Sequence, residues 1–533
     1  MDILKYISLM AVSVLTVTVM ASCSSSKKAE EPVEDIPITE EESAESETQE
    51  IEADSYPSYP IKADAVEESE FSELLEAEYE YYEDENLYGN YIIEGYSGSG
   101  YIEGFDGKGE FSFTVELPTS QHYDISLVIA SESRVKCGLK VNGKEVKKFE
   151  TDDSGEFKKI TLSGVYLESG TAEIGVVPEK NVALDCMQVV NSTAISEITY
   201  NPELLETDVN SGQSARRLME FLTANYGKRV ITGQYAENED NSELDLIYKI
   251  TGKYPAIRFA VLDNDSKSGD CKDINASLDW YERGGIVGAM WQWRSPSEKS
   301  SVYAKESDFD IKKAVTNYDI AGMTKEELKG LLESGYITEE CYKLIGDIDV
   351  ISEKLLILKS KGVPVIWRPL HEASLADKSG KGVYWWGAGG EDSYRWLWNL
   401  MYRRMTHYHG LDNLIWVWNG MSEGWTVDKS TYSIASYDIY TGSGEDYGSR
   451  YEQFASAQKY IGSDKILAIS ECDHIPDIDD IFRDKSVWSF FGLWYGEYLE
   501  DGKGNYSEKY TKKKELIRLY NSEGALTLDE VSY

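Results

Sequence analysis

The sequence predicts a multidomain protein in which a (β/α)8 TIM barrel follows an antiparallel β-sandwich module of the jelly-roll kind. Three observations predict this fold class. The chain has 533 residues, which is too long for one ordinary core. Short alternating strand-like runs, separated by turn signals, fill residues 71–192. From residue 210 to 533, eight apolar runs alternate with helix-length segments, as expected for eight βα units.

The amino-terminal segment is expected to direct export rather than to fold. Residues 1–22 carry Lys5, then an apolar stretch, and end in small residues before Cys23. A cysteine after Ala-Ser at this point resembles a bacterial lipobox, which implies acylation of Cys23 and anchoring on the outside of the cell membrane. A plain signal peptide and a membrane helix are the alternatives.

The charge of the chain separates a tether from the folded part. The net charge is −42, and between Ala29 and Gly107 the only basic residue is Lys62. We therefore predict an acidic disordered linker over residues 23–70. This charge excludes a nucleic-acid partner, because such a partner requires a basic face. The protein is expected to act as a monomer.

The segment 71–192 is typical of an antiparallel sandwich. Its runs, such as "GEFSFTVEL" and "HYDISLVIA", are separated by turns such as Asn142-Gly143. Cys137 and Cys186 within it either pair or are small buried hydrophobic residues. Residues 193–209 are interpreted as a second linker.

The carboxy-terminal part predicts strands and helices in alternation. A doubly wound sheet is the alternative, but the first run, "RVITGQY", lacks the Gly-rich phosphate turn of that fold. Helix-length segments such as "TKEELKGLLESG" and "SYRWLWNLMYRRMTHYHG" separate the runs. The eight runs are 229–235, 254–261, 284–293, 363–370, 414–419, 433–440, 465–472 and 489–496.

The tryptophans point to the face of the barrel that carries chemistry. All 13 lie at position 280 or later, inside the predicted barrel. Flat apolar rings beside polar groups are suited to the C–H faces of sugars. Five fall near carboxyl ends of strands, where TIM-barrel active sites lie: Trp291, Trp293, Trp385, Trp386 and Trp494.

Two carboxylates are the candidates for catalysis. Glu372 follows the fourth run in "RPLHEA", and Glu471 ends the seventh in "ISEC". On opposite walls of one cleft, such a pair can flank a glycosidic bond, one as proton donor and the other as nucleophile. Their environments must differ so that one is neutral and the other charged. Arg368 lies four residues before Glu372, whereas no cation neighbours Glu471 in sequence.

Other chemistries fit the sequence less well. The five histidines form no HExxH or other metal-ligand spacing. A GxSxG elbow and a Gly-rich phosphate loop are also absent from the sequence. We therefore expect catalysis without a cofactor.

The ordered motifs "WRPLHEA…YWWG", "NLIWVWN", "YDIY", "ISEC" and "GLWYG" resemble glycoside hydrolase family 26 over about residues 210–520. Most members are retaining endo-β-1,4-mannanases, so the resemblance implies that β-mannan or a related plant polysaccharide is the substrate. It also implies the site residues: Glu372 as general acid/base, Glu471 as nucleophile, His371 at the −1 sugar, Arg368 at the strand-four exit, Tyr440 bonded to the nucleophile, Trp494 as the −1 floor, and Trp385 and Trp386 along the cleft.

Two departures from the family pattern bear on the substrate. "MWQWRSP" places Gln292, after Trp291, where the family usually has a histidine, and the link "ASLADKSGKGVYWWG" is longer than usual. The donors for the non-reducing-side sugars are therefore altered. Two alternatives follow: an endo-glycanase acting on mixed-linkage β-glucan or β-1,3-xylan, and a non-catalytic surface protein that binds glycan.

The module at 71–192 resembles carbohydrate-binding module family 35. The matching motifs are "LEAEYEYYEDENL", "YSGSGYIEGF", "LKVNGK" and "VALDCMQVV". The resemblance implies a structural calcium held by Glu76, Glu78 and Asp185, which carry the hard oxygen donors that calcium prefers. It leaves open whether the module binds sugar or is a spacer.

Overall fold

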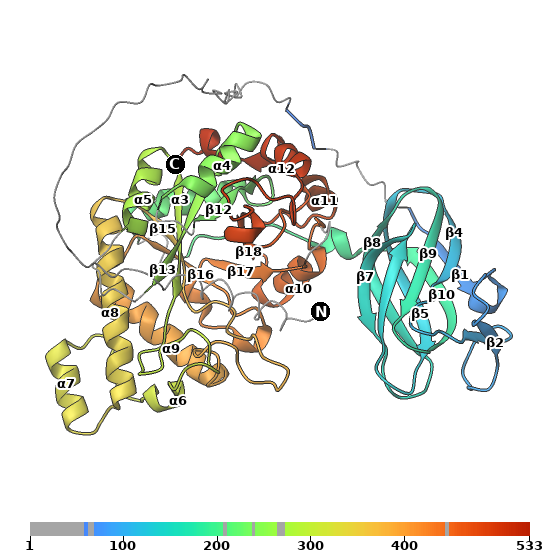
Figure 1. Ribbon diagram of the computed structural model, residues 1–533, viewed down its shortest axis with the longest axis horizontal. Coiled ribbons are helices and arrows are strands. Elements are labelled where there is room, and N and C mark those ends of the chain that lie inside the picture. Colours follow the sequence, from blue (N-terminus) through green and yellow to red (C-terminus); the bar gives the residue numbers. More distant parts are fainter. Residues whose placement is uncertain (1–57, 62–68, 206–210, 237–239, 264–271, 443–446) are drawn as a thin grey trace, which may run out of the picture.

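The computed structural model describes residues 58–61, 69–205, 211–236, 240–263, 272–442 and 447–533. The predicted signal at 1–22, the acylated Cys23 and most of the 23–70 linker lie outside the described residues. A β-sandwich and a barrel lie beside each other along the long axis of the molecule (Figure 1). Among the described residues, no helix has the length and apolarity needed to cross a bilayer.

The sandwich consists of a six-stranded and a four-stranded antiparallel sheet. In the first, the order is β2-β3-β10-β5-β8 with β1 also on β10, and in the second it is β4-β9-β6-β7. The strands are β1 (Ser72–Glu76), β2 (Tyr88–Asn90), β3 (Tyr101–Glu103), β4 (Phe111–Leu117), β5 (Gln121–Ala130), β6 (Lys136–Val141), β7 (Lys144–Glu150), β8 (Lys158–Leu167), β9 (Gly170–Pro178) and β10 (Ala183–Asn191).

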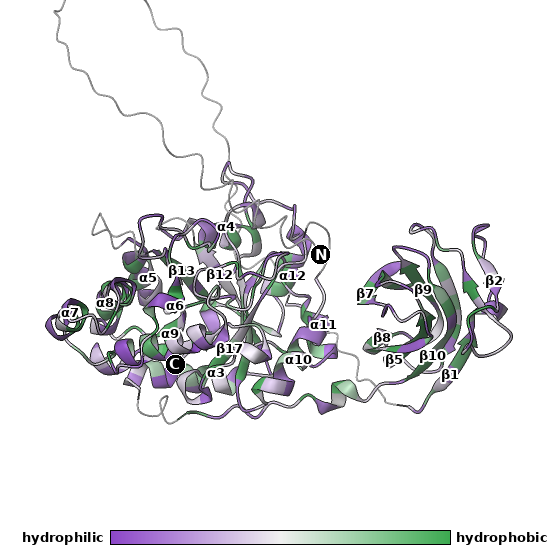
Figure 2. Ribbon diagram, turned by 90° about the horizontal axis from the view of Figure 1, so that it is seen from below, coloured by the Kyte–Doolittle hydropathy of each residue, from purple (hydrophilic) through white to green (hydrophobic). Residues whose placement is uncertain are grey.

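Alternation along the strands builds the core of the sandwich. In β4, Phe111, Phe113, Val115 and Leu117 are buried while the residues between them face outward. The strands of the sandwich carry both hydrophobic and hydrophilic residues (Figure 2). This period-2 pattern is the one from which the sandwich was predicted.

Eight parallel strands form a closed barrel in chain order, which confirms the predicted fold class. Each falls within one of the eight predicted runs except for the last residue or two of the first two. They are β12 (Gly233–Ala236), β13 (Ile257–Asp263), β14 (Ile286–Gln292), β15 (Val365–Arg368), β16 (Leu414–Trp418), β17 (Ile434–Ile439), β18 (Ile466–Cys472) and β19 (Phe491–Leu493).

Helices cover the outside of the barrel, and a short parallel pair, β11 (Val230–Ile231) with β20 (Ala525–Leu526), lies at its amino-terminal end. Helix α7 begins with a capping box between Thr324 and Glu327. The helices are α3 (Gln213–Asn225), α4 (Ser242–Thr251), α5 (Lys272–Glu282), α6 (Ile311–Ala314), α7 (Lys325–Glu333), α8 (Glu339–Ser360), α9 (Glu391–Arg403) with a π-turn at Arg404–Tyr408, α10 (Tyr451–Ile461), α11 (Ile478–Arg483) and α12 (Lys513–Tyr520).

The ring of Phe259 fills the barrel interior because neighbouring strands carry glycine. A Cβ on Gly233 or Gly288 would lie 2.6 or 2.2 Å from this ring. Tyr235, the register partner of Phe259 on the neighbouring strand, stacks on it with ring centroids 4.8 Å apart. The packed interior therefore gives rigid support to the side chains at the carboxyl ends of the barrel strands.

A buried polar contact joins the sandwich to the barrel. His122 of β5 is 4% exposed, and its Nε2 lies 2.8 Å from Oδ1 of Asp484, just after α11. The Ser449 hydroxyl donates to the other oxygen of Asp484 at 2.5 Å. The guanidinium of Arg483 lies over the ring of Tyr166 in β8, 4.4 Å from its centroid. The module is thus docked on the barrel.

The described parts of both predicted linkers contact the barrel. In the described part of 23–70, Tyr59 pairs with the barrel: its N–H donates to the Asn521 carbonyl at 2.9 Å. In the described part of 193–209, which is 193–205, the Asn201 N–H donates to the Ser463 carbonyl at 3.0 Å. Both segments gain backbone hydrogen bonds on the barrel surface, which composition alone does not show.

The cysteines of the sandwich are free and buried. Cys137 lies on β6 of one sheet and Cys186 on β10 of the other. Burial raises the pKa of the Cys137 thiol to about 12 and that of Cys186 to about 11, so both stay protonated at neutral pH. Of the two alternatives, the structure supports small buried hydrophobic residues.

Candidate active site

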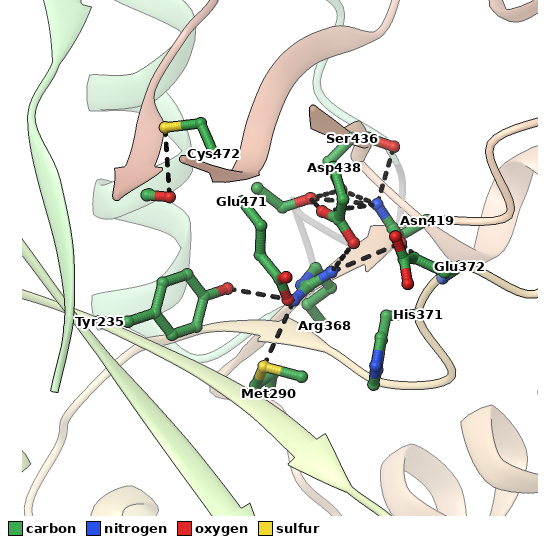
Figure 3. Close-up of polar contacts among 12 residues, drawn as sticks. Tyr235, Met290, Arg368, His371, Glu372, Asn419, Ser436, Asp438, Glu471 and Cys472 are labelled. Carbon is green, nitrogen blue, oxygen red and sulfur yellow. Dashed lines mark hydrogen bonds and ion pairs between the residues drawn. The ribbon is translucent and has the colours of Figure 1, made fainter. Parts of the chain in front are cut away.

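Glu372 and Glu471 lie at the same end of the barrel. Glu471 is the second-last residue of β18, the seventh barrel strand, and is 3% exposed. Glu372 follows the end of β15, the fourth strand, by four residues and is half-buried. Figure 3 shows their side chains around Arg368. The predicted meeting of the two carboxylates at the carboxyl ends of the strands is therefore present.

A strained turn presents Glu372. Leu370 and Glu372 have positive φ angles of 52° and 49°, in the left-handed region that non-glycine residues seldom adopt. The Glu372 N–H donates to Oδ1 of Asn419 at 2.7 Å, which anchors the turn to the residue after β16. The turn re-aims the chain so that consecutive residues His371 and Glu372 both face the site.

Arg368 holds two carboxylates in the barrel interior. Its side chain is 4% exposed and donates to Oδ2 of Asp438 at 2.7 Å and to Oε1 of Glu471. The same guanidinium donates to the Tyr235 hydroxyl at 3.2 Å. Glu471 has no cation near it in sequence, but Arg368 of the fourth strand provides one in the fold. A buried charge needs such pairing to be tolerated.

Asn419 ties the two acidic strands together. Its amide donates to the Ser436 carbonyl at 3.0 Å and to the Ser470 hydroxyl at 3.0 Å, while Oδ1 accepts from Glu372. Ser470 in turn donates to Oδ1 of Asp438 at 2.5 Å. This network connects β16, β17 and β18 through direct hydrogen bonds and fixes the Asp438 carboxyl group and the Glu372 backbone.

Glu471 has a mixed environment. Burial raises its pKa to about 7, while the Arg368 charge opposes the rise and the Asp438 charge adds to it. The Tyr440 hydroxyl donates to Oε2 of Glu471 at 2.8 Å, which also favours the charged form. The contact predicted between Tyr440 and Glu471 is present.

Glu372 has a more strongly raised pKa. Burial raises it well above the ordinary value, and the charges of Asp438 and Glu471 raise it further. A hydrogen bond from the Tyr384 hydroxyl and the more distant Arg368 charge act in the opposite direction. Both pKa values are therefore raised, but that of Glu372 more strongly, because Arg368 and Tyr440 bond the charged form of Glu471. Glu471 thus loses its proton at a lower pH than Glu372, which is the order that nucleophile and acid need.

His371 is a neutral ring enclosed by aromatic side chains. It is 2% exposed, and its ring lies edge-on to Tyr384 and Trp386 at centroid distances of 4.7 and 5.1 Å. Burial, then the charge of Arg368, lowers its pKa well below the ordinary value. Nδ1 is buried with no hydrogen-bond partner among the described residues.

The structure corrects the expectation that Trp385 and Trp386 line a cleft. Both are fully buried, and their indole N–H groups donate to the carbonyls of Trp293 and His371 at 2.7 and 2.8 Å. Trp291 is also fully buried, stacked on Trp293 at 4.0 Å. These rings support the site from behind, because their faces are already used in packing.

Trp494 and Gln292 lie at the rim of the site. Trp494, just after β19, is 7% exposed and contacts the Tyr235 ring at 4.6 Å. Gln292 ends β14, half-buried and in register with Asp263 of β13. Their predicted sugar contacts remain predictions.

The sequence interpretation missed four members of the site: Tyr235, Tyr384, Asn419 and Asp438. Asn419 and Asp438 occur in the quoted motifs "NLIWVWN" and "YDIY" but were given no role. A polar residue at the carboxyl end of a barrel strand was the available signal for Tyr235, Asn419 and Asp438. Tyr384 begins the quoted motif "YWWG", but a loop position gave no signal that the chain folds back toward Glu372 there.

The sandwich carries a separate group of carboxylates. Oxygens of Glu76 and Asp185 lie with the Cys186 sulfur within 4.8 Å of one another. Glu78 borders the group, because a Cβ on Gly98 would lie 2.2 Å from Glu78 Oε1 and 3.3 Å from the Glu76 carboxyl carbon. Glu78 Oε2 is buried with no partner in the described chain. Burial raises the pKa of Asp185 and the Glu76 charge adds to the rise, while hydrogen bonds from Ser97 oppose it. Oxygen donors with an unmatched negative charge fit a calcium ion.

A TIM barrel with two carboxyl groups of opposed environment at the carboxyl ends of strands four and seven defines a glycoside hydrolase. The profile of glycosyl hydrolase family 26 matches residues 207–530. The chain belongs to this family.

Three known proteins are similar over both domains. A mannan endo-1,4-β-mannosidase of Thermothelomyces thermophilus is 30% identical, over 82% of this chain and 86% of the relative. Mannan endo-1,4-β-mannosidase B of a Piromyces species is 29% identical, over 85% and 77%. The crystal structure of the Podospora anserina GH26-CBM35 β-(1,4)-mannanase matches with a TM-score of 0.56 and 27% identity, over 86% and 98%.

The raised pKa of Glu372 predicts a pH-dependent effect of Glu372→Gln on stability. An acid whose pKa is raised by folding stabilises the folded state below its unfolded pKa, and this contribution is lost as pH rises through the folded pKa. The glutamine variant lacks this loss. Its midpoint of thermal unfolding should therefore exceed that of the wild type at pH 8.5 and match it near pH 5. An equal difference at both pH values would contradict the raised pKa.

Proposed function

We propose that this protein is a retaining endo-β-1,4-mannanase that uses Glu471 as nucleophile and Glu372 as general acid/base. The observation that carries the proposal is the pair of carboxyl groups at the ends of β15 and β18, of which Arg368 and Tyr440 bond only Glu471, so that the pKa of Glu372 is the more strongly raised. The similar proteins named above are mannanases, which supports mannan as the substrate class.

The first half of the reaction uses each group in its resting state. The Glu471 carboxylate attacks the anomeric carbon of the −1 sugar, and the bond to the leaving oxygen breaks as that oxygen takes the Glu372 proton. Because Tyr440 and Arg368 fix both oxygens of Glu471, little reorganisation is needed for attack. A covalent glycosyl-enzyme and a shortened chain result.

The second half reverses the role of Glu372. Its carboxylate takes a proton from water, the water oxygen bonds to the anomeric carbon, and the bond to Glu471 breaks with its electron pair returning to that carboxylate. His371, next to the acid/base in the chain, and Trp494, just after β19, are the residues we assign to contact the −1 sugar, as the family resemblance implies. Catalysis needs no cofactor in this scheme.

Variants of the two glutamates test the assignment. Glu372→Ala should lower kcat on mannan by about 10²- to 10⁴-fold, the usual worth of a general acid/base. Glu471→Ala should lower it at least as much, because no covalent intermediate can form. Reducing-sugar release and circular dichroism give activity and folding. Near-wild-type turnover by either folded variant would exclude its role.

The same assay on a panel of glycans addresses the substrate. Gln292 at the rim favours the second candidate, an endo-glycanase on mixed-linkage β-glucan or β-1,3-xylan. Faster release of reducing sugar from one of these glycans than from mannan would identify that glycan, in place of mannan, as the substrate. Binding to glycan without products would leave only a surface glycan-binding protein.

We further propose that the sandwich is a calcium-containing carbohydrate-binding module. Its tyrosines cluster in sequence around the carboxylates: Tyr79, Tyr81 and Tyr91 are 69%, 82% and 74% exposed. Glu78 accepts from the N–H groups of the 97–100 turn, and this turn adjoins Asn90, next to Tyr91. β2, beside these residues, lies on the side of the module away from the barrel in both views. Such rings are suited to sugar faces, and Glu76, Glu78 and Asp185 would hold the ion.

Removal of calcium should weaken the module. With EDTA we expect a lower midpoint for a first unfolding transition and release of the protein from insoluble mannan, both restored by added Ca²⁺. A Tyr79→Ala, Tyr91→Ala variant should be released without EDTA while its unfolding is unchanged. If EDTA alters neither observable, the calcium is excluded, and retention of the tyrosine variant would exclude that surface.

We also propose that the protein is a lipoprotein held on the outside of the cell membrane by an acyl group on Cys23. The support is the sequence around Cys23 alone. Cells grown with an alkyne-labelled palmitate analogue should label the wild type and not Cys23→Ser. An unlabelled wild type would leave a plain secreted enzyme.

A further inference from the structure

The side chain of Asp473 closes the turn that follows β17. Strands β17 and β18 pair in parallel as far as Ile439 and Cys472, where their backbone pairing ends. Beyond this point, Oδ2 of Asp473 accepts hydrogen bonds from the N–H groups of both Thr441 and Gly442, each at 2.8 Å. A carboxylate thus continues the contact between the two strands where the backbone no longer does.

The turn depends on this carboxylate because its N–H groups are withdrawn from water. Asp473 is 1% exposed, and Gly442 is buried with a φ of 94°. A turn through the left-handed region directs consecutive N–H groups to one side, where an anionic oxygen binds them. The other oxygen of Asp473 lies 2.9 Å from Nδ1 of the buried His474. Without Asp473, the two N–H groups would lose their acceptor, which is costly in a dry interior.

Tyr440 is the residue from which this turn starts, and it touches the nucleophile. Its hydroxyl donates to Oε2 of Glu471 at 2.8 Å, while Arg368 donates to Oε1. The Tyr440 ring meets the ring of Tyr498 edge-on at 5.8 Å. Ring packing therefore holds the side chain, and the Asp473 carboxylate holds the backbone that immediately follows it.

We propose that Asp473 is a positioning residue, whose carboxylate fixes the turn after Tyr440 and so holds the Tyr440 hydroxyl against the nucleophile Glu471. This inference rests on the retaining mechanism proposed above. Asp473 acts through the turn, because its oxygens bond the turn and contact His474. When the turn shifts, the carboxylate form of Glu471 loses a donor, and the nucleophile is then ionised only at higher pH.

Two effects of removing Asp473 have opposite signs. Loss of the Tyr440 hydrogen bond raises the pKa of Glu471, because that bond favours the charged form. Loss of the Asp473 charge by itself lowers the same pKa, because a nearby anion disfavours a second one. The direction of the change therefore separates positioning from a direct charge effect. The other groups that interact electrostatically with Glu471 are kept in the Asp473 variants: Tyr235, Tyr303, Arg368, Glu372, Tyr384 and Asp438.

The pH dependence of Asp473→Ala and Asp473→Asn on 2,4-dinitrophenyl β-mannobioside tests the proposal. Dinitrophenolate leaves without a proton, so the acid limb of kcat/KM reports ionisation of Glu471, whose pKa burial raises to about 7. Asp473→Ala should move this limb up by about one pH unit, as for loss of one charge-assisted hydrogen bond. Asp473→Asn also lacks the charge but keeps an acceptor oxygen, so its limb should stay at the wild-type position.

A double-mutant cycle with Tyr440→Phe shows whether Asp473 acts through the tyrosine. Tyr440→Phe alone should move the acid limb up, and adding Asp473→Ala should move it no further. A second shift of equal size would show that Asp473 acts elsewhere. The proposal is overturned if the limb of Asp473→Ala stays or moves down, or if Asp473→Asn shifts as far as Asp473→Ala.

Circular dichroism checks the folding of each variant. If Asp473→Ala does not fold, Asp473→Glu keeps the charge and displaces the acceptor oxygens by one methylene group. Its acid limb should also move up, and an unmoved limb would refute the inference. Where the glycan panel identifies another substrate, the dinitrophenyl glycoside of its disaccharide replaces the mannobioside. A wild type that cleaves no such glycoside would instead refute the proposed function.

Discussion

The buried guanidinium of Arg368 is the interaction on which the site depends. It lies among Asp438, Glu471 and Tyr235, from three other strands of the barrel. Carboxylates placed this close in a dry interior would repel each other and take up protons without a cation between them. Arginine suits the position, because its planar fork bonds two acceptors at once and keeps its charge when buried.

The fold places the two glutamates in different environments relative to this cation. Glu471 lies within a strand, where Arg368 and Tyr440 reach both of its oxygens. Glu372 lies on a turn beyond its strand, away from the cation and beside two anions. Position relative to one charge thus separates an acid from a nucleophile, and no difference in residue type is needed.

The aromatic residues contribute mainly as a rigid support. The stacked pairs Trp291–Trp293 and Tyr384–Trp386 lie near His371 and Glu372, and the indole N–H of Trp386 donates to the His371 carbonyl. Such packing fixes the strained turn at Leu370 and Glu372, which costs free energy that the surroundings must offset. The packing thus holds a catalytic side chain on a loop in position as precisely as a strand would hold it.

The sequence by itself determined the two architectures and the location of the catalytic pair, because strand alternation and strand–helix periodicity are local patterns, and carboxyl ends of parallel strands always meet at one face. Only the tertiary structure decided which tryptophans are buried, that Arg368 pairs with Glu471, and that Tyr384 returns to Glu372. Burial and ion pairing depend on which strands become neighbours and how a loop folds back, and these contacts span up to about a hundred residues of sequence (Arg368 to Glu471 being 103 apart).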